Sequence, residues 1–120
     1  MMKVLATTVL GFIALGTSAY AADARFDDLY DNTLVYTSPK HVITKVFVQK
    51  DGTWTSTATD GKMAHGSWAP LGDFVCVYDA TMPKTKPDCS QAVAHKVGDK
   101  WTEPGAKKGT VDQVTILVGR

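Results

Sequence analysis

From residue 33 onward, apolar and polar residues alternate with a period of two in short runs, the pattern of β-strands that bury one face. Residues 41–50 show it best, because one face there is the more uniformly apolar and carries Val42, Thr44, Val46 and Val48. Further strands are expected at 34–37, 53–59, 63–68, 74–79, 91–96, 100–102 and 111–118. The pattern predicts an all-β domain of about eight short strands.

The turns between these runs predict antiparallel neighbours. Asp51-Gly52 and Asp60-Gly61 supply the positive φ angles of tight hairpins, and residues 97–99 are expected to join 91–96 to 100–102 as another hairpin. Closure into a barrel would remove the exposed edges of such a sheet. We therefore expect a small antiparallel up-and-down barrel or meander rather than a sandwich. An eight-stranded barrel is filled by side chains or holds one small ligand.

Two positions inside the predicted strands suggest how the sheet packs. Threonines line one side of residues 53–59, which suits a solvated face, so Trp54 on the other side is expected to point inward. Gly66 lies inside a predicted strand, where glycine often marks a close approach of another side chain to the backbone. Trp68, two residues further on, is the expected neighbour of Gly66.

The first 21 residues have the three parts of a secretory signal peptide: Lys3, an apolar run at 4–15, and small residues before a cut after Ala21. The apolar run is shorter than the roughly 20 residues that cross a bilayer as a helix, so cleavage is expected rather than membrane anchoring, and no membrane span is expected afterwards. The sequence thus predicts a signal peptide at 1–21 and a single all-β domain at 22–120.

A short helix is expected at the start of the mature domain, in residues 22–30. Phe26, Leu29 and Tyr30 follow a helical spacing and form a narrow apolar stripe. A helix of this length is marginal alone, so it must dock on the sheet.

Charge and cysteine content narrow the class of protein. The chain has 13 basic and 12 acidic residues, and Lys3 leaves with the signal peptide, so the mature domain is formally neutral. It lacks the basic surface that nucleic-acid binding usually requires. The two cysteines predict a disulfide between Cys76 and Cys89 in an exported chain. A catalytic thiol is the rival interpretation, and it would need an activating base.

No catalytic or cofactor motif is evident. His41, His65 and His95 lie on three different predicted strands without the short spacing of metal ligands, so no metal site and no cofactor are expected. Most aspartates are expected in turns, and four of them, Asp51, Asp60, Asp73 and Asp99, neighbour a glycine. The sequence therefore predicts a protein that is not an enzyme. An enzyme with His65 or His95 as general base is the least favoured hypothesis.

Aromatic residues and one loop are the candidates for binding. Tryptophan at a barrel mouth can hold an apolar ligand or stack on a sugar, and it can equally fill the core. The candidate ligand-binding residues are Trp54, Trp68, Trp101, Tyr36 and Tyr78. The alternative is an interaction loop at 81–88, between the cysteines, with Met82, Lys84 and Lys86 as its candidate contacts.

The motifs Asn32-Thr33-Leu34, Asp51-Gly52-Thr53 and Gly66-Ser67-Trp68, followed by the two cysteines, resemble a class of small exported proteobacterial proteins of uncharacterised function. The resemblance covers most of the mature chain. It implies a lipocalin-like barrel and a periplasmic or secreted location in a Gram-negative bacterium, and it implies no activity.

Two functions are consistent with these features. The first is a small periplasmic or secreted non-enzymatic binding module for an unknown apolar or sugar ligand. The alternative is a protein-interaction or enzyme-inhibitor module that presents loop 81–88 to an envelope protein.

Overall fold

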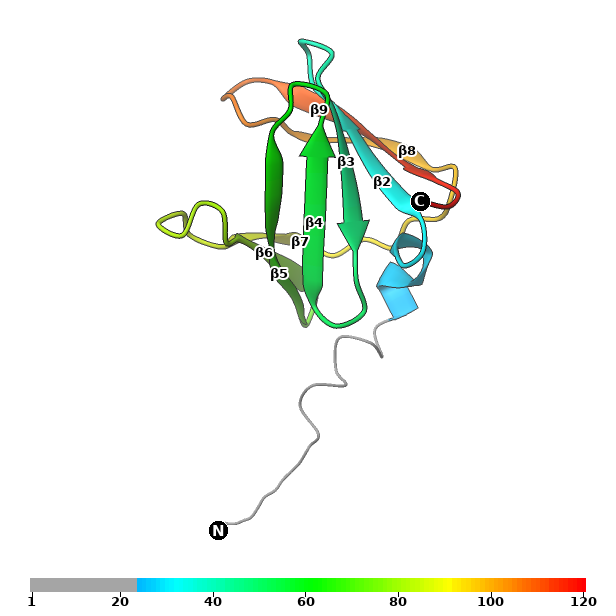
Figure 1. Cartoon of the computed structure of the whole chain (residues 1–120). Helices are drawn as coiled ribbons and strands as arrows, with labels where there is room; N and C mark the ends of the chain where they lie inside the picture. The colour runs from blue at the N-terminus through cyan, green and yellow to red at the C-terminus, as the bar shows by residue number, and fades with distance from the viewer. Residues whose placement is uncertain (1–23) are drawn as a thin grey trace.

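The computed structural model describes residues 24–120, which form one curled antiparallel sheet with a short helix at one end (Figure 1). The predicted signal peptide, residues 1–21, lies outside the described residues. The elements are the 3-10 helix η1 (Ala24–Leu29) and the strands β2 (Thr33–Thr37), β3 (Ile43–Val48), β4 (Thr53–Ala58), β5 (Met63–Leu71), β6 (Phe74–Asp79), β7 (Asp88–Gln91), β8 (Lys100–Pro104) and β9 (Val111–Leu117).

The strands form a single sheet in the order β7-β6-β5-β4-β3-β2-β9-β8, and all neighbours are antiparallel. The all-β prediction is confirmed. Within the described part of the chain, β7 and β8 each pair with only one neighbour, so the curled sheet is a half-barrel with two open edges. Residues 92–99 connect these two edges without forming a strand ladder.

The predicted hairpin of 91–96 with 100–102 is wrong. Residues 88–91 pair with β6 instead, because the disulfide holds Cys89 directly opposite Cys76. Strand β8 pairs with β9, where Trp101 faces Val114. Of the predicted hairpin, only the turn at 97–99 is present, and the Asp99 amide closes it by donating to the Lys96 carbonyl oxygen at 2.9 Å. Residues 92–99 connect β7 to β8, and we call this segment the strap.

The N-terminal helix forms where the sequence predicts it, as a 3-10 helix. Phe26 and Tyr30 are buried, and Leu29 packs between the two hydrophobic clusters of the core. The Asn32 side chain ends the helix by donating to the Asp28 carbonyl oxygen at 3.0 Å. The apolar stripe thus covers one end of the half-barrel, as a short helix needs in order to be stable.

The core consists of two hydrophobic clusters. One lies beneath the helix and contains Phe26, Tyr30, Val48 and Trp68, with Trp54 and Val75 packed against it. The other lies between β2 and β9 and contains Leu34, Val114 and Ile116, with Tyr36 and Trp101 packed against it. The alternation of β3 is confirmed, since Val46 and Val48 contribute to this core.

Gly66 marks a close approach, as predicted, but its neighbour is Trp54 rather than Trp68. The register places Gly66 directly opposite Trp54. A Cβ atom on Gly66 would overlap with the Tyr78 carbonyl oxygen and would come within 2.9 Å of the Trp54 indole. The indole therefore lies across the glycine, as aromatic side chains do over glycine in neighbouring strands.

Candidate functional site

The five aromatic residues proposed to bind a ligand lie in three separate places. Trp68 and Trp54 belong to the core beneath η1. Trp68 is 5% exposed, meets the Phe26 ring edge-on at 5.3 Å between centroids, and donates from Nε1 to the Gln49 carbonyl oxygen at 3.1 Å. Trp54 donates to the Tyr78 carbonyl oxygen at 3.2 Å. Both side chains hold the sheet together.

Tyr36 and Trp101 lie close together, on the inner side of β2 and β8. Both are opposite Val114 of β9, which lies between them. Their polar ends converge on Glu103: the Trp101 Nε1 donates to Oε2 at 2.8 Å, and the Tyr36 hydroxyl faces Oε1 at 3.3 Å. A carboxylate held by two aromatic donors is thus fixed in position on the concave face.

Burial raises the pKa of the Tyr36 hydroxyl well above its ordinary value, and the charge of Glu103 raises it further. Asp112 and Asp88 act in the same direction. Asp88 belongs to β7, at the edge of the sheet opposite β8, which carries Glu103. The acidic side chains around Tyr36 thus favour the protonated hydroxyl.

This environment predicts a loss of stability at high pH that depends on Tyr36. The unfolded chain releases the Tyr36 proton above about pH 10, whereas the folded chain keeps it, so the unfolded state binds fewer protons and stability falls as pH rises. The free energy of unfolding of the wild type, measured in urea from pH 8 to 11.5, should decline relative to Tyr36→Phe by up to about 1.4 kcal/mol per pH unit above pH 10.

Tyr78→Phe, on the outer face, is the matched control for this measurement. A difference between the wild type and Tyr36→Phe that stays constant over the whole pH range would contradict the buried position of the hydroxyl.

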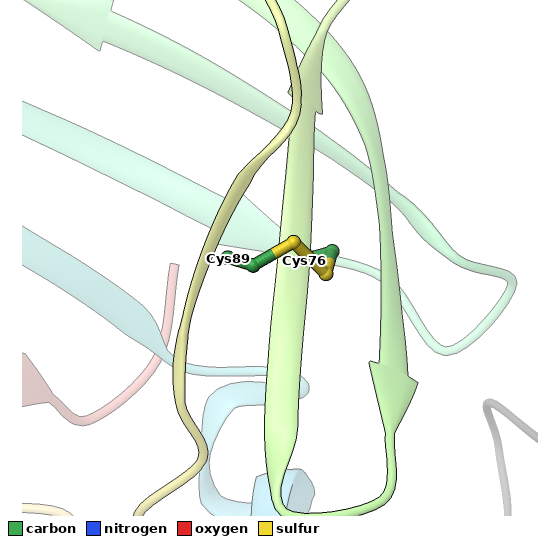
Figure 2. Close-up of a disulfide and its surroundings, with 2 residues drawn as sticks. All are labelled: Cys76 and Cys89. Atoms are coloured by element: carbon green, nitrogen blue, oxygen red, sulfur yellow. A yellow bond between two sulfur atoms is a disulfide. The ribbon is translucent and has the colours of Figure 1, made fainter.

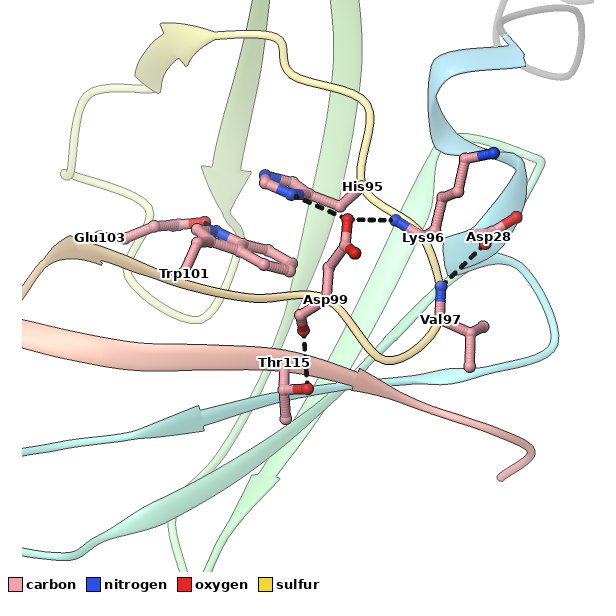
Figure 3. Close-up of polar contacts among 8 residues, drawn as sticks. All are labelled: Asp28, His95, Lys96, Val97, Asp99, Trp101, Glu103 and Thr115. Carbon is pink, nitrogen blue, oxygen red and sulfur yellow. Dashed lines mark hydrogen bonds and ion pairs between the residues drawn. The ribbon is translucent and has the colours of Figure 1, made fainter.

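His95 covers one face of the Trp101 indole (Figure 3). The two rings are stacked, with centroids 3.5 Å apart and planes inclined by 2°, and the His95 Nδ1 lies 3.7 Å from an oxygen of Asp99. The sequence did not single out Glu103 or this use of His95. The sequence contains one signal for the pairing of Glu103 with Trp101. Glu103 is the only glutamate, and it follows Trp101 by two residues, which places both side chains on one face of a strand.

The three histidines lie apart. His41 is in the turn after β2 with a φ of 63°, His65 is exposed on β5, and His95 is in the strap. Within residues 24–120, no three histidine, cysteine, aspartate or glutamate side chains are arranged to hold a metal ion.

The outer face carries Tyr78 and the disulfide. The predicted bridge is confirmed between Cys76 of β6 and Cys89 of β7, whose Cα atoms are 4.0 Å apart (Figure 2). Next to it lies a shallow depression of about 400 Å³, lined among others by Ala69, Cys76, Tyr78 and Pro87. Tyr78 is therefore on the opposite side of the sheet from Tyr36 and Trp101.

The loop between the cysteines projects from this outer face. Every residue from 80 to 91 is exposed, and Met82 is 59% exposed. Met82, Lys84 and Lys86 are therefore accessible together on one loop, whose two ends are tied by the disulfide.

In residues 24–120, no helix has the length and apolar character needed to cross a membrane. The strands and the 3-10 helix account for the regular structure of this part of the chain. Comparison with known proteins adds no relative, since no family model, curated protein or solved structure matches the chain.

Proposed function

We propose that the mature chain is a non-enzymatic binding module that engages another protein of the cell envelope through the disulfide-bounded loop 81–88. The observation that carries this proposal is that every residue of the loop is exposed while its two ends are tied together by the disulfide. An ordered, exposed loop on a rigid sheet loses little conformational entropy when it binds, which favours affinity.

Several hydrogen bonds hold the loop in place. The Thr81 amide donates to the Asp79 carboxylate at 2.9 Å, and the Thr85 amide donates to the Met82 carbonyl oxygen at 2.9 Å. The Thr81 hydroxyl accepts from the His65 amide at 3.0 Å, which attaches the loop to β5. The Tyr78 hydroxyl lies 3.3 Å from the Pro83 carbonyl oxygen. Tyr78 thus supports the loop conformation.

The chemistry of the loop indicates the kind of partner surface. Lys84 and Lys86 are its charged residues between Asp79 and Asp88, and Met82 offers a flexible apolar side chain. Methionine adapts well to irregular apolar recesses. We infer that the partner presents an acidic surface with a small apolar recess, since complementary charge steers association and selects the partner.

The positions of the aromatic residues favour a large apolar or sugar ligand on the concave face less than they favour a partner at the loop. Trp54 and Trp68 are used in packing, Trp101 is covered by His95, and Tyr78 lies on the outer face. A single site built from all five aromatic residues would need side chains from both faces of the sheet.

Export to the periplasm or the medium forms part of this proposal. Its support is the disulfide, which persists in oxidising compartments, together with the leader-like sequence of residues 1–21. The proposed membership of the exported proteobacterial class rests on the motif order alone.

Photo-crosslinking tests the proposal. With p-benzoylphenylalanine in place of Met82, irradiation of intact cells should give a discrete adduct, and the same group in place of Thr57, exposed on β4, should not. Lys84→Glu combined with Lys86→Glu should reduce the adduct about tenfold through charge repulsion. The proposal fails if position 82 gives no adduct, or if both positions give the same adducts.

A further inference from the structure

The strap, residues 92–99, is anchored mainly at its ends. The Ala92 amide donates to the Asp73 carbonyl oxygen at 2.8 Å, and the Gly98 amide donates to the Ile116 carbonyl oxygen at 2.9 Å. Near the second end the Val97 amide donates to the Asp28 carboxylate at 2.8 Å. Within residues 24–120, the amides of residues 93–95 form no hydrogen bond. The middle of the strap therefore depends on its side chains.

His95 provides that attachment (Figure 3). Its ring is stacked on Trp101 at 3.5 Å, and its Nδ1 faces the Asp99 carboxylate at 3.7 Å. The His95 side chain is 24% exposed, so solvent reaches part of it. Lifting residues 93–95 would uncover one face of the indole and would break this stack and the contact of His95 with Asp99.

The indole beneath His95 is a rigid platform. Trp101 packs against the cluster of Leu34, Val114 and Ile116, and its Nε1 is fixed by Glu103. Each Glu103 oxygen receives one donor, from Trp101 or from Tyr36, and a carboxylate oxygen can accept a second. The platform thus combines a flat aromatic face with an adjacent anionic acceptor.

We propose that His95 occupies, as an internal ligand, the stacking site of an external planar organic cation of the amidinium or guanidinium class. Such a cation stacks on the face of tryptophan and donates to the carboxylate beside it. It enters when the middle of the strap lifts and the imidazole leaves the indole. This site is on the concave face, distinct from the loop at 81–88, so either proposal can fail without the other.

The competing imidazole lowers the apparent affinity of the site. A ligand that binds only the open form has its affinity reduced by the fraction of molecules that are open. Removing the imidazole should therefore strengthen binding, whereas removing a residue that contacts the ligand should weaken it. This opposite response distinguishes a displaced latch from an ordinary binding residue.

Benzamidine is a suitable probe, and titration calorimetry with the oxidised mature protein measures its binding. His95→Ala should bind benzamidine at least about tenfold more tightly than the wild type, as expected when a mostly closed site is opened. Adding Trp101→Leu to that variant should abolish binding, and adding Glu103→Gln should weaken it. His65→Ala, at an exposed position on β5, should bind as the wild type does.

Two further measurements test whether the cation is recognised and provide a second variant. Benzamide, the neutral analogue, should bind His95→Ala at least about tenfold more weakly than benzamidine does if the cation is recognised. Asp99→Asn is the second variant, for use if His95→Ala does not fold. It keeps the imidazole but removes the charge that faces it, and it should strengthen benzamidine binding by a smaller factor than His95→Ala. The proposal is overturned if neither variant binds more tightly than the wild type, or if benzamide and benzamidine bind alike.

Discussion

Replacing Trp68 with alanine is expected to lower the free energy of unfolding by about 4 kcal/mol, as truncation of a buried aromatic side chain does. Trp68 is 5% exposed and contacts Phe26 of η1 and Tyr30, which directly follows η1. The substitution leaves a cavity there and removes the donor to the Gln49 carbonyl oxygen. For a domain of this size, about 4 kcal/mol is close to half of the usual stability.

Urea unfolding of the oxidised domain, residues 22–120, measures this change. Phe74→Ala is a matched control, because Phe74 is also aromatic and lies in the neighbouring strand but is 53% exposed. It should cost less than about 1 kcal/mol. Equal losses for the two variants would mean that Trp68 is not part of a packed core.

Replacing Gly66 with alanine is expected to cost about 3 kcal/mol, the upper end of the usual range for overpacking. The added Cβ would overlap with the Tyr78 carbonyl oxygen and press on the Trp54 indole. Neither can move easily, because that oxygen accepts from the Trp54 Nε1 and belongs to the paired strand β6. The corresponding drop in melting temperature is about 15 °C.

Thermal unfolding followed by circular dichroism checks the Gly66 prediction. His65→Ala, at the preceding and exposed position of β5, should change the melting temperature by less than about 3 °C. If Gly66→Ala melts within the same narrow range, the close contact of β4, β5 and β6 at this point does not exist.

Local signals in the sequence were enough to predict most of the sheet. The alternation in β3, the Asp-Gly turns and the isolated Gly66 each depend on neighbouring residues or on directly adjacent strands. The disulfide could also be predicted, because the chain contains two cysteines and a leader-like start. These features need no knowledge of how the sheet curls.

The grouping of the candidate site could not be predicted in the same way. Tyr36 and Glu103 are separated by 67 positions in the chain, and they meet because β9 pairs with β2 and β8 with β9. The short run 91–96 has the composition of a strand, but the disulfide draws the preceding residues to β6 and leaves most of the run without a partner strand. Long-range pairing decides both outcomes.

We propose that the sheet and its two core tryptophans, Trp54 and Trp68, provide stability, whereas the loop between the cysteines binds the partner protein. Crosslinking at position 82, compared with position 57 in the same strain, tests it most directly, because both residues are exposed and only one lies in the loop. We expect one discrete adduct at position 82 and none at position 57. Absence of the adduct at 82, or identical adducts at both positions, would contradict it.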